Sequence, residues 1–344
     1  MDFTYSETQE AVLQAATEVL DSAAPEAAWK ALGQAGLLSL ALPESLGGDG
    51  LGAIETGIVL TELGRRALVT PAFPALSLSL ALTRLNRADL LTADTFLTFA
   101  LAQPRLKPSL TSAQAALSST ASVPGSASAQ AATPAPGTAS APSAMAASVE
   151  GATSAASGGR KVAAPFLAEA SRVLLVGRRE TAVAAASDVE PGFSSSGLAE
   201  SNATLTAGQA VGGDVFPYLL SGAIAMVDGL LAGALDLTTA HLRTREQFGK
   251  PLATFQIAAG HIADVYIAWR TTHLLALSLA WGLDTGKDVS ADVEAAEHWL
   301  ETEALKALRT CHHLHGGIGL DVTYPLHRYY SLVKDLTRYV HRSH

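Results

Sequence analysis

The sequence predicts a mainly α-helical protein with an N-terminal helical domain, a reduced middle β domain and a C-terminal four-helix bundle. Three observations predict this fold class. Helical hydrophobic patterns separated by Gly- and Pro-marked turns occupy residues 1–95. Strand-like segments are confined to residues 96–212. Long apolar patterns of helical period occupy residues 213–344, where turns divide them into four helices.

Composition limits the classes of protein that the chain can belong to. Its 344 residues include 48% hydrophobic and 16% charged ones, so a large core is expected. The net charge of −9 argues against a nucleic-acid-binding surface, which needs clustered Lys and Arg. Since the sequence has no apolar run of about 18 residues and no secretory signal, we expect no membrane span. The single Cys311 fits a reducing compartment, and we expect a cytoplasmic protein.

Turn residues mark the helices of the N-terminal domain. The first pattern that we assign in this domain spans Pro25–Leu40, where proline suits the first helical turn. Trp29 and Leu32 fall on one face of this helix, and Gly36 is a suitable C-terminal stop. A second pattern runs over Leu51–Leu68. The segment between the two patterns is rich in turn residues.

The middle zone contains few strand signals. Phe96–Leu101 and Val173–Val176 are rich in Phe, Leu and Val and are predicted to be short strands. Residues 108–160 consist mainly of Ala, Ser, Thr, Pro and Gly, and Glu150 is the only charged residue before Arg160. Such a stretch has too few large apolar groups to offset its ordering entropy. We therefore predict a reduced β domain with a flexible insertion.

The C-terminal zone is predicted to contain four antiparallel helices. Their expected extents are Tyr218–Arg245, Phe255–Trp281, a third from Asp288 or Ser290 to the glycines at 316 and 317, and a fourth with Pro325 at its first position. Three glycines on the first helix would permit close approach of a neighbouring helix; they are Gly222, Gly229 and Gly233. Four residues of the second helix are expected to point inward: Ile262, Val265, Tyr266 and Trp269.

The end of the first long helix carries a possible binding motif, Arg245-x-x-Phe248-Gly249-Lys250, followed by Gln256. Arg offers a planar fork for phosphate groups, Phe an apolar face, and Gln both a donor and an acceptor. The alternative interpretation is an ordinary helix C-terminus, with a cation that interacts favourably with the helix dipole and a glycine stop.

A second motif, His312-His313-Leu314-His315-Gly316-Gly317-Ile318-Gly319, lies downstream. Its glycines would let the backbone approach a ligand closely. Three histidines in four positions could instead indicate a metal site. Only Cys311 supports that alternative at ligand spacing, so we expect no metal.

Together these motifs resemble those of the acyl-CoA dehydrogenase family. The N-terminal zone adds Trp29-x-x-Leu32, Pro43-Glu44-x-x-Gly47-Gly48-x-Gly50 and Glu62-Leu63-Gly64-Arg65 in the family's order and spacing. The resemblance covers residues 1–90 and 215–340. The segments 321–325 and 334–338 are especially similar to the short partner subunits of actinobacterial steroid side-chain acyl-CoA dehydrogenases.

The resemblance implies residues that bind FAD. In the family, the Arg, Phe and Gln of the first motif touch the FAD of a neighbouring subunit, and the Gly-Gly turn approaches its adenosine half. His313 stands where the family usually has Gln, and it can still make a hydrogen bond. The residues implied to bind the cofactor are Arg245, Phe248, Gln256, His313, Gly316 and Gly317.

The resemblance also shows what this chain lacks, since the family uses a Glu as the catalytic base at one of two places. The first place aligns near Leu219, and the second near Val340 or, with a three-residue shift, Ser343. No glutamate lies between Glu200 and Glu246, and none follows Glu303. A general base must reach the substrate proton, so no catalytic residue is expected here.

Two segments that hold a subunit's own FAD in the family are also altered. Leu101-Ala102-Gln103-Pro104 looks like a remnant of the family's flavin-binding loop. By the same resemblance, Arg338-Tyr339-Val340-His341 stands in place of the stretch that holds the subunit's own FAD. We therefore do not expect the chain to hold a complete FAD alone.

The resulting hypothesis is a non-catalytic subunit of a heteromeric, FAD-dependent acyl-CoA dehydrogenase. A catalytic paralogue would be its partner in a two-plus-two heterotetramer, and the resemblance suggests a steroid side-chain CoA thioester as substrate. One alternative is a homomeric acyl-CoA dehydrogenase with an unusual base such as Asp228. Another is a helical scaffold without a redox role.

Overall fold

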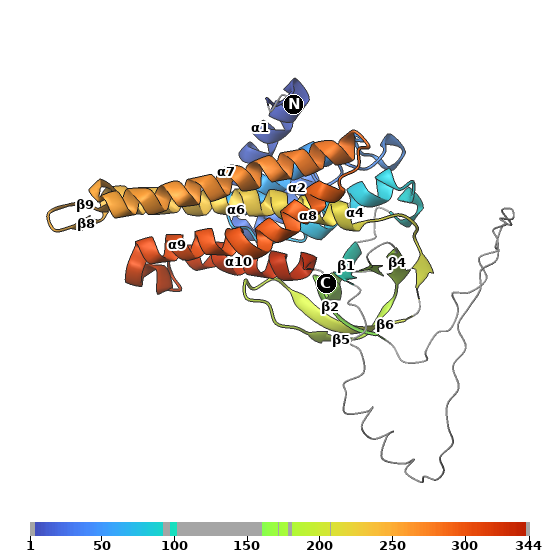
Figure 1. Ribbon diagram of the computed structural model, residues 1–344. Helices are drawn as coiled ribbons and strands as arrows, with labels where there is room; N and C mark the ends of the chain where they lie inside the picture. Colours follow the sequence, from blue (N-terminus) through green and yellow to red (C-terminus); the bar gives the residue numbers. More distant parts are fainter. Residues whose placement is uncertain are drawn as a thin grey trace, which may run out of the picture. The chain divides into compact units, whose positions relative to one another are not determined.

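Short helices form the N-terminal domain of the computed structural model, which describes residues 4–91, 97–101, 160–170, 172–177, 181–206 and 208–341 (Figure 1). The described residues belong to one compact unit. Its N-terminal helices are α1 (Glu7–Ser22), α2 (Ala28–Gln34), α3 (Ala53–Arg65) and α4 (Ala72–Arg84), with short 3-10 turns at Pro25–Ala27, Glu44–Leu46 and Ala88–Leu90. The predicted flexible insertion lies outside the described residues, apart from Arg160.

The N-terminal helices follow local sequence signals. The helix predicted from Pro25 begins as a 3-10 turn, and its α-helical part ends at Gln34, earlier than expected. Gly36 adopts φ +75°, a left-handed conformation that favours glycine and stops the helix. The sequence did not single out α4, because this helix is buried around most of its circumference and has no clear amphipathic stripe.

Short strands form the middle domain (Figure 1). One sheet has the order β1-β3-β4-β7 and another the order β2-β6-β5. The predicted strands correspond to β1 and β3, which pair in parallel with Phe99 opposite Leu174. The strands are β1 (Leu97–Leu101), β2 (Arg160–Pro165), β3 (Arg172–Val176), β4 (Thr181–Ala184), β5 (Ala186–Pro191), β6 (Glu200–Leu205) and β7 (Gln209–Ala210).

Sequence patterns missed the remaining strands of the middle domain because those strands are short and contain few large apolar residues. Strand β5, for example, is exposed along nearly its whole length and carries no hydrophobic alternation. Its pairing with β6 forms across a register shift between Ser187 and Glu190. Partner strands distant in sequence therefore define it more than its own residues do.

The C-terminal helices agree with the predicted bundle. The third predicted helix is continuous, but a π-helical segment, η6, divides it into α8 and α9. Pro325 directly precedes the last helix. The elements are α6 (Phe216–Thr244), the hairpin β8 (Glu246–Gln247) and β9 (Lys250–Pro251), η5 (Leu252–Thr254), α7 (Gln256–Asp284), α8 (Ser290–Trp299), η6 (Leu300–Ala304), α9 (Leu305–His315), η7 (Gly316–Leu320) and α10 (Leu326–Val340).

The structure of helix α7 contradicts one prediction about which of its residues point inward. Val265 is buried, and Ile262 and Trp269 are half-buried, as expected. Tyr266, which was predicted to point inward, has 49% of its surface exposed. The buried positions of α7 include Ala268, Thr272 and Leu279, so the inward face is rotated away from Tyr266. Because the expected set was chosen by hydrophobicity alone, it included a residue of the outer face.

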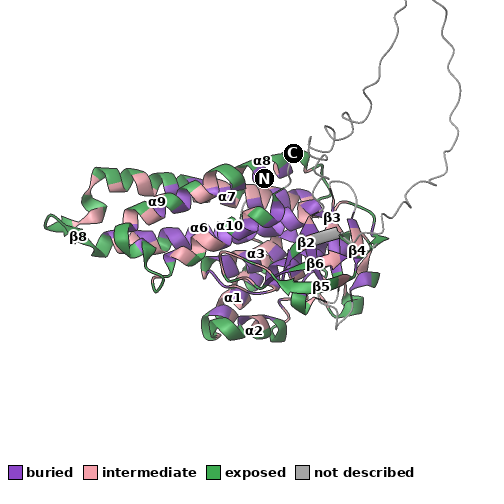
Figure 2. Ribbon diagram, turned by 90° about the horizontal axis from the view of Figure 1, so that it is seen from below, coloured by how far each residue is buried: buried purple, intermediate pink, exposed green. Residues whose placement is uncertain are grey.

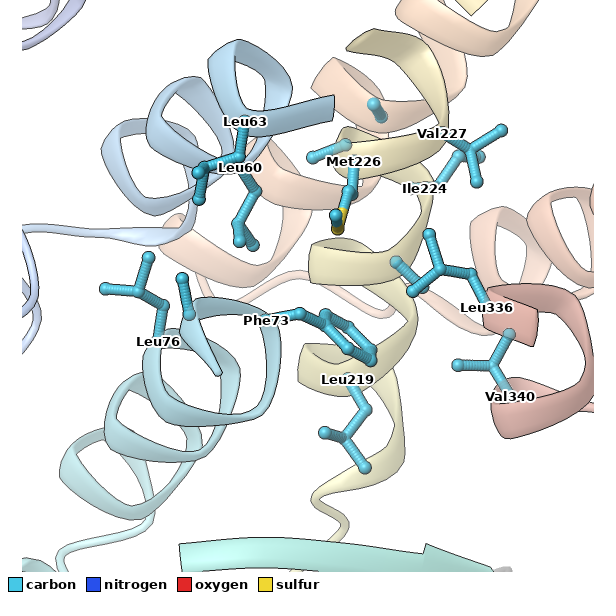
Figure 3. Packing of buried hydrophobic residues seen from close by; sticks show 14 of the residues in the cluster. Leu60, Leu63, Phe73, Leu76, Leu219, Ile224, Met226, Val227, Leu336 and Val340 are labelled. Carbon is cyan, nitrogen blue, oxygen red and sulfur yellow. The ribbon is translucent and has the colours of Figure 1, made fainter. Parts of the chain in front are cut away.

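Helix α6 is the central buried helix of this unit. It is long and apolar enough to cross a membrane by length and composition, with a mean hydropathy of 1.7 in its most apolar window. That window is 94% buried inside the protein, as expected of a core helix. Figure 3 shows its side chains Leu219, Ile224 and Met226 in the hydrophobic cluster with residues of other helices.

The three predicted glycines of α6 do allow close helix contacts. A Cβ atom built on Gly229 would lie 1.9 Å from the carbonyl oxygen of Thr61 on α3. One on Gly233 would lie 2.2 Å from the carbonyl oxygen of Arg65, and one on Gly222 would lie 2.1 Å from Oγ of Ser77 on α4. Since backbone atoms cannot move aside as a side chain can, α3 fixes the position of α6.

We therefore expect Gly229→Ala to destabilise the protein by about 1–3 kcal/mol, because the added methyl group overpacks the α3–α6 contact. Gly57→Ala is the matched control, since its Cβ would make an ordinary 3.5 Å contact with Ala225. Chemical denaturation measures both free energies of unfolding. Equal stability of the two variants would contradict the close packing described here.

Candidate functional site

The hairpin after α6 displays the first predicted motif. Arg245 is the C-cap of α6, and its N–H donates to the carbonyl oxygen of His241 at 2.8 Å. The Arg245 carbonyl accepts a hydrogen bond from the N–H of Leu252, also at 2.8 Å, which closes the hairpin loop. The chain reverses at Phe248 and Gly249, with φ angles of +54° and +75°. A left-handed conformation is uncommon for a bulky residue such as Phe.

This turn leaves Phe248 92% exposed. Its ring meets that of Phe255 edge-on, with centroids 6.3 Å apart, and Nζ of Lys250 lies 4.5 Å from the Phe255 centroid. Gln256 follows as the first residue of α7 and is exposed. Arg245, Phe248 and Gln256 therefore lie on one short exposed segment between α6 and α7.

The second predicted motif ends α9. Gly316 is the C-cap of this helix with φ +60°, and His313, Gly316 and Gly317 are all exposed. A Cβ atom built on either glycine would meet nothing within 4 Å. The backbone of this turn is therefore open, and a ligand group could approach it closely.

Two ring contacts join the motifs. His241, one turn before Arg245, stacks on His315, with centroids 4.5 Å apart and an interplanar angle of 19°. His261 on α7 meets His313 edge-on at 5.7 Å. Figures 1 and 2 both show the β8–β9 hairpin and α9 at the same end of the bundle. The fold thus gathers all six sequence-predicted residues at this end.

His315 has a structural role in holding the turn. It is 5% exposed, its Nδ1 lies 2.8 Å from the carbonyl oxygen of Cys311, and its Nε2 lies 3.0 Å from the hydroxyl of Tyr324. Burial lowers the pKa of His315, and the neighbouring His241 lowers it further. In the described part of the chain, no group of three or more His, Cys, Asp or Glu residues is placed to hold a metal ion.

The sequence did not identify the histidines that connect the two motifs. His241 and His261 precede Arg245 by four residues and follow Gln256 by five, at helical spacing from the predicted motif. That spacing placed them near the motif, but their partners on α9 are distant in sequence. Only the packing of α6 and α7 against α9 brings these rings together.

Apolar residues occupy the two positions where the resembled family has its base. Leu219 on α6 has no exposed surface, and Val340, the last residue of α10, is 2% exposed. Figure 3 shows both side chains in the hydrophobic cluster that also contains Phe73. The alternative position, Ser343, lies outside the described residues. Neither described position can take up a proton.

The segment Arg338–His341, at the place of the family's flavin-holding stretch, has a buried middle at Tyr339 and Val340 and exposed ends. Tyr339 is 6% exposed, and its hydroxyl donates to Oε2 of Glu200 at 2.6 Å. Arg338 donates to Oε1 of the same Glu200 at 3.2 Å. Burial raises the pKa of Tyr339, as does its hydrogen bond to Glu200. The ring of Tyr339 also meets Phe99 of β1 edge-on at 6.5 Å. This segment therefore ties α10 to the β domain.

Asp228, the alternative base, is a buried residue of α6. It is 3% exposed, and its Oδ2 lies 2.9 Å from Nδ1 of His273 on α7. Its Oδ1 is buried without a hydrogen-bond partner among the described residues. Because the carboxylate lies between two packed helices, a substrate would need to separate them to reach it.

The arrangement at the bundle end is suited to binding. Arg245 can make paired hydrogen bonds to phosphate oxygens, and Phe248 presents a free ring face. Gln256 adds an amide, and His313 adds an imidazole. The open turn at Gly316 and Gly317 leaves room for a planar or phosphate-bearing group beside the backbone. These side chains and the open turn could therefore hold phosphate and planar groups of a ligand.

Comparisons with known proteins agree with these observations. The family model for the acyl-CoA dehydrogenase N-terminal domain matches residues 5–88, and that for the C-terminal domain matches residues 221–339. Acyl-CoA dehydrogenase FadE28 of Mycobacterium tuberculosis is 36% identical over 356 residues, covering 98% of this chain and 94% of that protein. FadE27 of the same organism is 29% identical, covering 89% of this chain and 82% of that protein.

Solved structures share the fold. The ChsE4–ChsE5 complex from Mycobacterium tuberculosis has a TM-score of 0.74 at 24% identity, covering 99% of this chain and 95% of that chain. A variant of the Tcur3481–Tcur3483 steroid ACAD has a TM-score of 0.72 at 22% identity, covering 98% and 94%. The FAD complex of PigA has a TM-score of 0.65 at 17% identity, covering 99% and 98%. At these identities the likeness establishes the fold.

The histidines of the site make stability depend on pH. Burial lowers the pKa values of His241, His312 and His315 below the usual value of about 6.5, so folding favours their neutral forms. Their contribution is therefore complete above about pH 6.5 and is lost as pH falls through the lowered values. We expect the free energy of unfolding to fall as the pH falls below about 6.5.

His241→Phe keeps a ring stacked on His315 but removes one titrating group, so its stability is expected to fall less steeply over this pH range. Denaturant titrations at several pH values measure the slope. A slope in the variant as steep as that of the parent protein would contradict a role for His241 in this pH dependence.

Proposed function

The chain belongs to the acyl-CoA dehydrogenase family, whose cofactor is FAD, and we propose that it is the non-catalytic subunit of a heteromeric enzyme. In this proposal it contributes half of an FAD site whose other half lies on a catalytic paralogue. The observation that carries the proposal is the contrast between the two regions of the chain. The bundle end is exposed and suited to binding, whereas both described base positions are apolar and buried.

Six residues would hold the pyrophosphate and adenosine end of the partner's FAD. Arg245 would pair with the pyrophosphate, and Phe248 would cover an apolar part of the cofactor. Gln256 and His313 would supply hydrogen bonds, and the Gly316–Gly317 backbone would lie beside the adenosine. The exposure of all six residues supports this assignment, since a partner's cofactor can reach them without any rearrangement of the fold.

The paralogue would supply the chemistry. A Glu of that subunit would remove the proton from the carbon alpha to the thioester. Bound FAD would supply the acceptor for the hydride that leaves the beta carbon. By resemblance to the family, such a Glu would stand near Leu219, or near Val340 or Ser343, and no glutamate lies at these positions. The role of this chain in the reaction is therefore to position the cofactor and to complete the site.

The solved neighbours support a partner that is a paralogue. One is a ChsE4–ChsE5 complex, and the other is the Tcur3481–Tcur3483 steroid ACAD. By analogy, we propose a two-plus-two heterotetramer that dehydrogenates an acyl-CoA, with a steroid side-chain thioester as substrate. We also propose a cytoplasmic location, which fits a protein in which the long apolar helix α6 is buried.

We expect the purified chain alone to be colourless and the complex with its paralogue to be yellow, because only the pair completes an FAD site. Absorbance near 450 nm after desalting gives the flavin content of each. A control preparation of the lone chain is incubated with excess FAD before desalting. Stoichiometric flavin retained by the lone chain would contradict the proposal.

Arg245→Ala in the complex is expected to weaken FAD binding roughly 10- to 100-fold, since a hydrogen bond to a charged group contributes about 1.5–3 kcal/mol. Arg243→Ala is the matched control, because Arg243 is also exposed in the last turn of α6 but is not one of the six residues. Titration of the deflavinated complexes with FAD measures both dissociation constants. Equal dissociation constants of the two variant complexes for FAD would contradict a role for Arg245 in FAD binding.

Substrate class is tested on the same complex. Steroid side-chain and straight-chain fatty acyl-CoA thioesters are assayed in parallel with an artificial electron acceptor. We expect a higher kcat/KM for the steroid thioester. A similar or higher kcat/KM for the fatty thioesters would contradict the proposed substrate class. The proposed subunit role is tested separately, by the flavin content of the complex.

A further inference from the structure

The proposed FAD site is divided between two helix ends that are distant in the sequence. Arg245 ends α6, and Gly316 ends α9. Pyrophosphate and adenosine are parts of one molecule, so the two helix ends bind it well only when they are already held at the right relative position. One contact that joins them is the stack of His241 on His315, whose ring centroids lie 4.5 Å apart.

His315 is anchored at the end of α9 because both of its ring nitrogens have partners. Its Nδ1 lies 2.8 Å from the carbonyl oxygen of Cys311. A carbonyl oxygen only accepts, so Nδ1 carries the hydrogen, and Nε2 accepts from the hydroxyl of Tyr324 at 3.0 Å. The two bonds hold this 5% exposed residue in one ring orientation. The ring is therefore a fixed point next to Gly316.

The glycine turn is bonded back onto α9 and follows its position. The N–H of Gly316 donates to carbonyl oxygens of the last turn of α9. A Cβ atom built on Gly319 would lie only 3.2 Å from Cβ of His315, so the turn also returns closely to the helix. Gly317 lies between these two points. A shift of the end of α9 would therefore move the backbone of Gly316 and Gly317 with it.

His241 makes the matching connection on α6. It lies one helical turn before Arg245, and its carbonyl oxygen accepts the N–H of Arg245 at 2.8 Å. The carbonyl oxygen of Arg245 in turn accepts from Leu252 and closes the hairpin loop. Because the half-buried ring of His241 packs on a fixed ring, the last turn of α6 cannot rotate or slide without breaking the stack.

We propose that His241 and His315 are positioning residues of the FAD site, whose stack holds Arg245 and the Gly316–Gly317 turn at the separation that one FAD molecule requires. This inference rests on the proposed function and deepens it. Neither histidine is among the six residues that would touch the cofactor. Both act through the groups that they hold in place, which separates them from the residues that bind the cofactor directly.

The surroundings of the pair favour neutral rings. Burial lowers the pKa of both histidines, Arg245 lowers that of His241 further, and His312 does the same for His315. Two protonated rings in this stack would repel each other, whereas neutral rings stack without that cost. The stack is therefore intact at neutral pH, where binding of FAD to the complex is measured.

Removal of one ring tests the stack. In the complex, His241→Ala is expected to weaken FAD binding about three- to tenfold, because a stacked pair contributes about this factor. His241→Phe keeps a ring over His315 and is expected to weaken binding less than about twofold. His298→Ala is the matched control, since His298 is an exposed histidine of α8 outside the site. Titration of the deflavinated complexes with FAD measures the dissociation constants.

A double-mutant cycle with Arg245→Ala distinguishes positioning from a general loss of stability. The relative position of the two helix ends matters only when both ends bind FAD. In the Arg245→Ala complex, His241→Ala is therefore expected to weaken binding further by less than about twofold. A merely structural role would give the same three- to tenfold weakening, about that expected of a stacked pair, with and without Arg245.

Tyr324→Phe tests the stack from the side of α9. It keeps the ring of Tyr324 but removes the hydroxyl that orients His315. FAD binding is expected to weaken about two- to fivefold, and this effect also should disappear when Arg245 is alanine. Chemical denaturation of each full-length variant verifies that it folds, so the proposal does not depend on His241→Ala alone.

The proposal is overturned by any of three results. These are equal weakening by His241→Ala with and without Arg245, a His241→Phe complex that binds FAD as weakly as His241→Ala, and dissociation constants of His241→Ala and Tyr324→Phe that match the parent complex. Failure of the proposed function gives a different result. In that case Arg245→Ala itself binds FAD as tightly as the parent complex, and the positioning role falls with the site.

Discussion

The close packing of α6 against α3 is the constraint on which the rest of the structure depends. At Gly229 and Gly233 the backbones of the two helices approach so closely that a methyl group would overlap a carbonyl oxygen. This contact fixes the axial position of α6. Its first turns then place Leu219 in the core, and its last turn places Arg245 at the exposed hairpin. One rigid helix therefore determines the position of both the buried region around Leu219 and the exposed hairpin at Arg245.

The buried position where the family has its base and the exposed segment suited to binding lie at opposite ends of this helix. At its start, a leucine and the nearby Val340 pack in the hydrophobic cluster (Figure 3), and Tyr339 is bonded to Glu200. At its end, exposed donors and an exposed aromatic ring lie on the hairpin, and an open glycine turn ends the neighbouring helix α9. A core filled by side chains is stable without a ligand, whereas an exposed aromatic such as Phe248 gains stability only when a partner covers it. This difference is the physical basis for assigning the chain a supporting role.

Much of the fold was readable from the sequence because α6 and α7 are long and strongly periodic, and because glycines marked the close contacts. Helix α4 could not be predicted because it lacks an amphipathic stripe. Strand β5 could not be predicted because it depends on partner strands that are distant in sequence. For the site, the resemblance to the family implied which residues would gather. The histidine contacts that join them, and the outward position of Tyr266, depend on how α7 is rotated against its neighbours, which hydrophobicity alone does not specify.

The central claim is that a pair of subunits holds one FAD, shared across their interface, and this can be counted. Native mass spectrometry of the intact complex gives the number of flavins and of each subunit in one measurement. The account predicts two FAD molecules in an assembly with two copies of each chain. Four FAD molecules in that assembly would mean that this chain also builds a complete flavin site of its own, and would contradict the account.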